Sequence, residues 1–171
     1  MPTLTHLAPL LLAGLLGACG SLPIEWPYRN PCTSSYQRPD WTRLKAELEQ
    51  AQARWTAADL QTYAYTRTAW NFAGEFVTRV DVENGVVVRV RDEQTGAVLG
   101  TDQAFTIDQL FVQLRTAVTQ AQANVQSCLL LTVTYDASLG FPTLIDTADL
   151  TVGLEDAFGT QRLSGLTPRA P

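Results

Sequence analysis

Residues 75–90 read EFVTRVDVENGVVVRV, and this stretch decides the fold. On both sides of Asn84-Gly85, apolar residues alternate with polar or charged ones. This pattern is typical of two short antiparallel strands joined by a tight turn. A two-residue loop pairs Val82 with Val87 and mixes the apolar and charged faces, so a longer loop has to be considered.

A three-residue loop over residues 83–85 keeps one face of this hairpin apolar. It pairs Val82 with Val86 and Val80 with Val88, so that the even-numbered residues of both arms face the same side. The glycine that ends the loop then takes the left-handed position of a bulge. We therefore predict an antiparallel hairpin in this register.

The segments before the hairpin predict a helix and a further strand. Asp40 is a suitable N-cap, and apolar residues follow it at spacings of three and four, as in an amphipathic helix. These residues are Trp41, Leu44, Leu48, Ala51 and Trp55. Residues 61–72 are rich in aromatic and β-branched side chains, which predicts a strand.

The segments after the hairpin predict a second helix and three more strands. Thr106 and Gln109 form a capping box, and a stripe of apolar residues follows them. Strands are expected near residues 128–136, 143–150 and 157–166. Together these segments predict an α+β domain in which helices and strands follow the order α-β-β-β-α-β-β-β along the chain. We predict an antiparallel sheet of about six to seven strands with two helices on one face.

The first twenty residues predict export and a lipid anchor. Residues 7–16 carry no charge and are about half as long as a membrane-spanning helix, which fits the apolar region of a secretory signal. Residues 16–19, Leu-Gly-Ala-Cys, resemble the bacterial lipobox, in which the cysteine thiol receives a diacylglycerol. Acyl chains such as palmitate on Cys19 then hold the protein at a membrane. Ordinary secretion and a misassigned start codon are the alternatives.

These features divide the chain into three parts. We predict a lipoprotein signal peptide over residues 1–18, a proline-rich linker over residues 19–39 and one domain over residues 40–168. The expected location is the cell envelope, at the outer membrane or at the outer face of the cytoplasmic membrane. The membrane is then a partner of the chain through the lipid.

Two cysteines remain once Cys19 is acylated. Cys32 and Cys128 form an even pair in an exported chain, which predicts one disulfide. The alternative is a pair of buried free thiols.

Composition narrows the function. The chain has 17 acidic and 12 basic residues and a formal charge of −5, which disfavours nucleic acid as a partner. The one histidine, His6, lies in the signal segment, and Lys45 is the single lysine. Catalytic triads with histidine and histidine-ligated metals are therefore excluded from the exported part. We predict no enzyme and no cofactor, with a carboxylate-based hydrolase as the least favoured alternative.

Acidic residues gather in the last third of the chain, at Asp136, Asp146, Asp149, Glu155 and Asp156. Their spacing does not match the calcium-binding loop of an EF-hand. Solvated carboxylates are the simpler interpretation, and we predict no metal site.

Aromatic residues supply the candidate contact surface. Alternation along the strands cannot place all of them in the core, and amphipathic rings suit interfaces. The candidates are Tyr63, Tyr65, Trp70, Tyr135 and Phe141. Ordinary packing within the sheet is the alternative for each one.

The order of several residues resembles a family of uncharacterised bacterial lipoproteins that is catalogued as a domain of unknown function. The residues are Trp55, Tyr63-Ala64-Tyr65, Val80 to Gly85, Thr106-Ile107, Leu110-Phe111, Tyr135-Asp136, Gly140-Phe141-Pro142 and Ile145. The resemblance covers about residues 40–168, with phenylalanine at position 141 where the family pattern predicts tyrosine. It implies no catalytic residue, because none is assigned in the family.

The expected function is non-enzymatic. We predict a lipid-anchored module that binds another envelope protein or an envelope polymer through an aromatic sheet face. The alternative is a carrier that holds an apolar ligand between the sheet and the helices.

Overall fold

The computed structural model describes residues 31–71, 74–151 and 158–169, which form one antiparallel sheet and two α-helices. The elements are α1 (Trp41–Ala58), β1 (Tyr63–Asn71), β2 (Gly74–Glu83), β3 (Val86–Asp92), β4 (Val98–Leu99), a 3-10 helix (Thr101–Gln103), α2 (Ile107–Ala123), β5 (Leu129–Tyr135), β6 (Pro142–Asp149) and β7 (Phe158–Pro168). The α+β class and the antiparallel sheet confirm the prediction from the sequence. Four strands precede α2, and the fourth is the two-residue β4, in the short segment between Gly96 and Gly100 where the sequence also indicates a strand.

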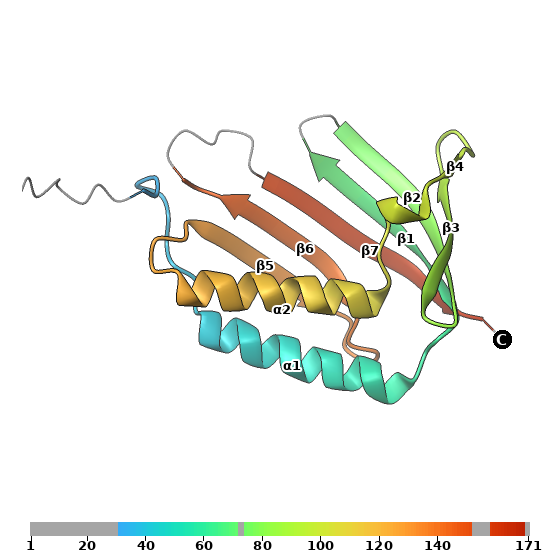
Figure 1. Ribbon diagram of the computed structural model, residues 1–171, viewed down its shortest axis with the longest axis horizontal. Helices are drawn as coiled ribbons and strands as arrows, with labels where there is room; N and C mark the ends of the chain where they lie inside the picture. The colour runs from blue at the N-terminus through green and yellow to red at the C-terminus, as the bar shows by residue number, and fades with distance from the viewer. Residues whose placement is uncertain (1–30, 72–73, 152–157, 170–171) are drawn as a thin grey trace, which may run out of the picture.

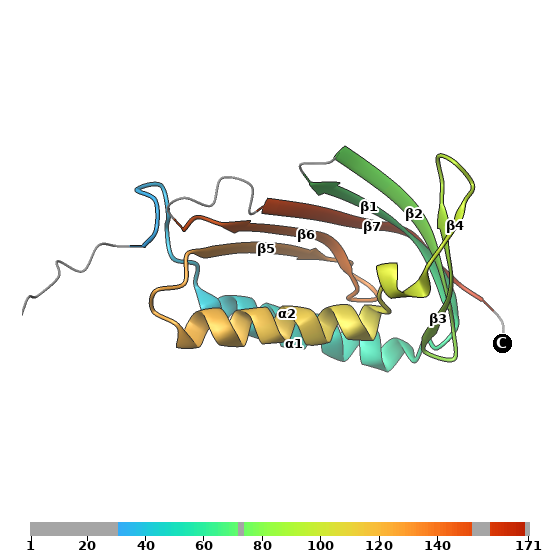
Figure 2. The ribbon, with the colours of Figure 1, turned by 45° about the horizontal axis from the view of Figure 1, so that its top comes forward.

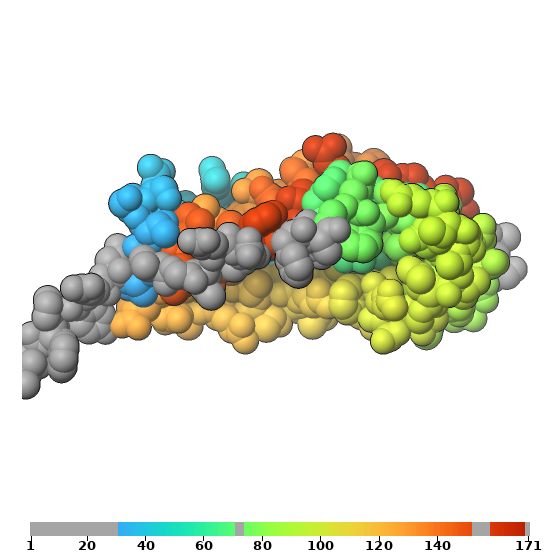
Figure 3. Space-filling model, turned by 90° about the horizontal axis from the view of Figure 1, so that it is seen from above, coloured from blue at the N-terminus to red at the C-terminus, as the bar shows by residue number. Residues whose placement is uncertain are grey.

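The strands lie in the order β4-β3-β2-β1-β7-β6-β5, and each neighbouring pair is antiparallel. β1 and β7 pair in the middle, so the two ends of the domain are joined at the centre of the sheet. The two helices lie side by side on one side of the sheet (Figures 1 and 2). The molecule is elongated, with residues 31–40 near one end and the hairpin of β2 and β3 at the other (Figure 3).

Both helices begin at the residues that the sequence predicts. The carboxylate of Asp40 accepts a hydrogen bond from the Arg43 N–H at 3.0 Å. Thr106 and Gln109 each accept the other's backbone N–H, at 3.1 and 2.8 Å. The buried helix residues are Trp41, Leu48, Ala51 and Trp55 in α1, and Ile107, Leu110, Phe111, Leu114, Val118 and Ala121 in α2. They form the core together with the covered side of the sheet.

Two buried tyrosines fix the start of α2 to the central strand. The backbone N–H of Ile107 donates to the hydroxyl of Tyr63 at 2.9 Å, and the hydroxyl of Tyr65 donates to the carbonyl of Phe105. Both rings are fully buried, and Trp55 meets Tyr63 edge to face with ring centroids 5.3 Å apart. Each hydroxyl thus has a partner inside the apolar layer, as burial requires.

The β2–β3 hairpin has a different register from the predicted one. Val82 pairs with Val87, so the turn has two residues, Asn84 and Gly85. Both have positive φ, 51° and 73°, which is the conformation of a type I′ hairpin turn. The predicted pairing of Val82 with Val86 is therefore wrong.

A bulge reconciles this short turn with an apolar face. The register shifts between Asp81 and Val82, and beyond the shift Val80 pairs with Val90. Both of these valines are buried, whereas Val86 and Val88 are 61% and 46% exposed. The extra residue in β3 changes the phase of the strand, so only the far half of β3 turns its even-numbered residues to the core.

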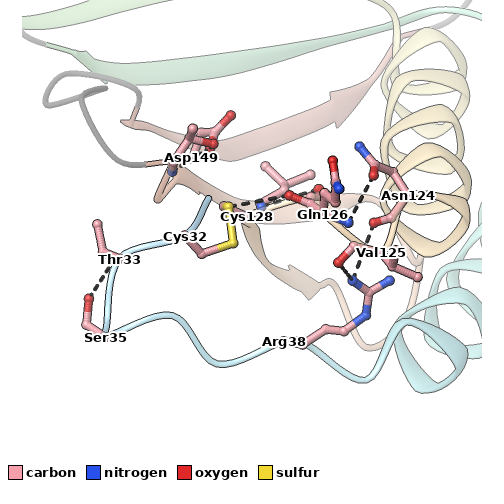
Figure 4. The surroundings of a disulfide bond; sticks show 12 residues. Cys32, Thr33, Ser35, Arg38, Asn124, Val125, Gln126, Cys128 and Asp149 are labelled. Atoms are coloured by element: carbon pink, nitrogen blue, oxygen red, sulfur yellow. Dashed lines mark hydrogen bonds between the residues drawn. A yellow bond between two sulfur atoms is a disulfide. The ribbon is translucent and has the colours of Figure 1, made fainter. Parts of the chain in front are cut away.

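The predicted disulfide joins Cys32 to Cys128, with the two Cα atoms 5.3 Å apart (Figure 4). Both cysteines are buried. Next to this bridge, the backbone N–H of Thr33 donates to the carbonyl of Leu150 at 2.8 Å. Residues 31–33 are therefore fixed against the strand layer although the sequence places them in the linker.

Arg38 makes a second attachment of this segment to the domain. Its guanidinium group donates to the carbonyl oxygens of Ala121 at 3.0 Å and Val125 at 3.2 Å, at the end of α2 (Figure 4). A cation at this position also interacts favourably with the negative end of the helix dipole.

None of the helices in the described ranges is long and apolar enough to cross a membrane.

Candidate interaction surface

The side of the sheet opposite the helices is the candidate interaction surface, and we call it the open face. Neither described helix packs on it (Figures 1 and 2). The strand registers place the following residues there: Arg89 and Arg91 on β3, Glu75, Val77, Arg79 and Asp81 on β2, Thr66, Thr68 and Trp70 on β1, Thr160, Arg162 and Ser164 on β7, Leu144 and Asp146 on β6, and Leu130, Thr132 and Thr134 on β5. The face is thus rich in arginine and threonine.

Three arginines meet at the β2–β3 end of the open face. Arg79 and Arg91 are direct cross-strand partners, and Arg89, two pairs further along, lies opposite Asp81. We call Arg79, Arg89 and Arg91 the arginine cluster. Like charges directly opposite each other destabilise a sheet, so this arrangement has an electrostatic cost.

The environment of the arginine cluster offers few counter-charges. One guanidinium nitrogen of Arg79 donates to Thr66 Oγ1 and to the carbonyl oxygen of Gly165, both at 3.2 Å. The nearest carboxylate in the sheet register is Asp81, and it forms an ion pair with Arg169 at 2.9 Å. The buried Nε of Arg91 has no hydrogen-bond partner among the described residues. Because this nitrogen is buried, it is not open to a partner, and the exposed guanidinium group of the cluster is that of Arg89.

Trp70 and Arg162 form a second feature of the open face. The guanidinium carbon of Arg162 lies 5.8 Å from the centre of the Trp70 ring, within the range of a cation–π contact. Trp70 is partly exposed and Arg162 is exposed. This pair extends the open face toward β7 with the two residue types that most often dominate protein interfaces.

The five aromatic residues predicted as a contact surface do not share one surface. Tyr63, Tyr65 and Phe141 are buried, with exposures of 0%, 0% and 6%. Tyr135 is half-buried on the helix side, where its ring stacks on Phe111 with centroids 6.4 Å apart. Of the five, Trp70 alone belongs to the open face. The prediction is therefore wrong for the three buried residues, which face the helices because β1 and the β5–β6 turn present that side to the core.

Burial also changes the acidity of these phenols. Loss of solvation raises the pKa of Tyr63 to about 12. Burial raises the pKa of Tyr65 and of Tyr135 as well. The three hydroxyls therefore stay neutral under physiological conditions and act as parts of the core.

The carboxylates of the acidic region are engaged within the fold. Asp136 accepts the N–H groups of Ser138 at 2.9 Å and Leu139 at 2.7 Å, and these hydrogen bonds lower its pKa. Asp146 accepts from Thr160 Oγ1 at 2.7 Å. No group of three or more potential metal ligands occurs in the described ranges. Glu155 and Asp156, like Cys19 and the signal segment, lie outside the described residues.

Three clefts of the domain bear on ligand binding. One, of about 180 Å³, is lined mainly by apolar residues of α2 and of β5 and β6, including Leu110, Leu114 and Ile145. A second, of about 320 Å³, lies at the edge strand β5 beside the first half of α1, and a third, of about 360 Å³, lies between the β2–β3 turn and the start of α2; both are more polar. The apolar cleft is smaller than the roughly 300–1,000 Å³ of most ligand pockets.

The model of a protein family of unknown function, DUF6174, matches residues 47–153, which make up most of the domain. The chain belongs to this family. The match includes α2, the arginine cluster and most of the open face, and it agrees with the resemblance to an uncharacterised domain. Among curated proteins, no match to the chain is found.

The arginine cluster could have been identified from the sequence, although the predicted contact surface included only aromatic residues. Arg79, Arg89 and Arg91 are odd-numbered residues that alternate with valines in the hairpin. Alternation of this kind identifies an outward face, and in the second arm of the hairpin both charged positions of that face, Arg89 and Arg91, are arginines. The neighbourhood of Arg162 could not be found in this way, because it depends on the pairing of β1 with β7.

Proposed function

We propose that this DUF6174 protein is an exported, lipid-anchored module of the cell envelope and that it binds a partner through the open face. The sequence Leu16–Cys19 supports the anchor through its resemblance to a lipobox. The disulfide between Cys32 and Cys128 supports an oxidising compartment outside the cytosol.

The observation that carries the binding role is the open face itself. One side of the sheet packs on two helices, whereas the other presents Trp70, Arg162 and the arginine cluster without a covering helix in the described ranges. Tryptophan and arginine are enriched at the centres of protein interfaces. A non-enzymatic binding role also agrees with the composition, because the one histidine of the chain, His6, lies in the predicted signal segment.

The carrier function has less support. A carried acyl chain or similar ligand needs an apolar cavity, and the apolar cleft beside α2 is about 180 Å³. The core between the helices and the sheet is otherwise filled by residues such as Tyr63, Tyr65 and Phe111.

Site-specific photo-cross-linking in cells tests the binding role. A photoreactive amino acid at Ser164, an exposed position of the open face, is compared with one at Val112, which is 57% exposed on α2. We expect a discrete cross-linked product from position 164 and none from position 112. Equal products from both positions, or none from position 164, contradict binding through the open face.

A further inference from the structure

The arginine cluster combines an electrostatic cost with an exposed guanidinium group, that of Arg89. Arg79 and Arg91 oppose each other directly, and Arg89 follows on the same strand. A sheet that places like charges opposite each other loses stability unless an anion lies between or above them. The nearest carboxylate, Asp81, lies opposite Arg89 and also forms an ion pair with Arg169, so the three arginines of the cluster share a single carboxylate with a fourth arginine. The fold therefore leaves the cluster with a net positive charge.

The side chains of the cluster are also partly ordered before any partner arrives. Thr66 and Gly165 hold one nitrogen of Arg79, and Arg79 and Arg91 are both half-buried on the sheet. A guanidinium group held in this way loses less conformational entropy when it binds. Arginine offers two parallel N–H donors to a carboxylate or a phosphate, so the cluster suits oxyanions.

The rest of the open face indicates which source of oxyanions fits best. Trp70 with Arg162 continues the face toward β7, and threonine and serine hydroxyls lie between these residues and the cluster. The single lysine of the chain, Lys45, is on α1 and not on this face. Arginine with tryptophan, without lysine, is the composition of a protein interface, whereas attraction to anionic lipids makes no distinction between arginine and lysine.

We infer that the arginine cluster binds the carboxylates of an acidic segment in a partner protein. This inference rests on the proposed function, because it assigns the chemistry of the partner that the open face contacts. Charge complementarity is its basis, since the cluster is a local excess of positive charge on a chain whose formal charge is −5.

Binding of fluorescently labelled polyglutamate to the full chain in a non-ionic detergent tests the inference. The test variant is Arg79→Gln/Arg89→Gln/Arg91→Gln. The matched control, Arg43→Gln/Lys45→Gln/Arg115→Gln, removes three exposed positive charges from the helix side. We expect the cluster variant to bind about tenfold more weakly or worse, and the control to stay close to the wild type. Affinity should also fall steeply as salt is added.

A second variant separates loss of binding from loss of folding, and a second ligand separates carboxylates from phosphates. The variant Arg89→Gln/Arg91→Gln leaves the hydrogen bonds of Arg79 intact, so it separates loss of binding from loss of folding. Phosphatidylglycerol vesicles present phosphates in place of carboxylates. Equal losses in the cluster and control variants, or cluster-dependent binding to vesicles without binding to polyglutamate, overturn the inference. A cross-link from position 164 together with unchanged polyglutamate affinity in the cluster variant overturns it and leaves the proposed function standing.

Discussion

The hydroxyl of Tyr63 accepts the backbone N–H of Ile107 across 2.9 Å, so the central strand completes the first turn of α2. The first N–H groups of a helix have no partner within the helix, and a buried one has to find a partner elsewhere. Replacement Tyr63→Phe leaves the ring against Trp55 and removes only this acceptor. We expect the free energy of unfolding to fall by about 1–3 kcal/mol in chemical denaturation.

Tyr36 supplies the matched control for that variant. Its hydroxyl is buried and has no hydrogen-bond partner among the described residues. Tyr36→Phe should therefore leave the free energy of unfolding unchanged or raise it slightly. A loss as large as that of Tyr63→Phe contradicts the role given to the Tyr63 hydroxyl.

The raised pKa of Tyr63 predicts how stability changes at alkaline pH. A free phenol has a pKa of about 10, and burial raises that of Tyr63 to about 12. Between these values the unfolded chain loses the proton and the folded chain keeps it. The contribution of Tyr63 is therefore complete below pH 10 and is lost as the pH rises toward 12. Denaturation curves at increasing pH, with Tyr63→Phe as a variant that lacks this group, measure the effect.

The disulfide predicts a large difference between the oxidised and reduced protein. Cys32 and Cys128 are 96 residues apart, and a cross-link over a loop of about 100 residues stabilises by about 4.7 kcal/mol in the chain-entropy model. We expect Cys32→Ser/Cys128→Ser to unfold at much lower denaturant concentration than the wild type. The wild type in a strong reductant should match the double variant, and equal stability of the oxidised wild type and the double variant contradicts this prediction.

Gly140 predicts a packing limit at the β5–β6 turn. Its φ is 82°, and a Cβ atom there would lie 2.2 Å from the backbone oxygen of Ala51 in α1. Gly140→Ala should cost about 3 kcal/mol or more, because it combines a left-handed conformation with a backbone clash. Gly96, with φ of 75° and no atom within 4 Å of its Cβ position, isolates the conformational cost. Thermal unfolding of Gly140→Ala and Gly96→Ala should show the larger loss for the first.

The proposed anchor makes a prediction of its own. Cys19→Ser removes the thiol that would carry the lipid, so the protein should leave the membrane fraction and lose the mass of the acyl chains. Fractionation and mass spectrometry of the two forms measure both changes. A wild type that is free of lipid and recovered with the cytosolic proteins contradicts export and anchoring together.

The elements that depend on local interactions could be predicted from the sequence. The capping residues Asp40 and Thr106 set the starts of both helices, and the spacing of apolar residues gave their buried sides. The disulfide was predicted from Cys32 and Cys128, the two cysteines that remain if Cys19 is acylated.

The parts that depend on distant pairing could not be predicted in the same way. The hairpin register depends on a bulge between Asp81 and Val82, which lets a two-residue turn coexist with an apolar face. Alternation along β1 separated Tyr63 from Trp70 but did not tell which side meets the helices. That choice is made by α1 and α2, which lie before β1 and between β4 and β5 in the chain and pack together on the sheet.

The attachment of residues 31–33 has a mechanical consequence. Tension on the chain ahead of residue 31 passes through the bridge at Cys32 to Cys128 and into β5. The stretch between Cys32 and α1 is thereby bypassed, and the helix is not peeled from the sheet. Force enters the sheet next to the start of β5, a strand that is paired with β6 over its whole length.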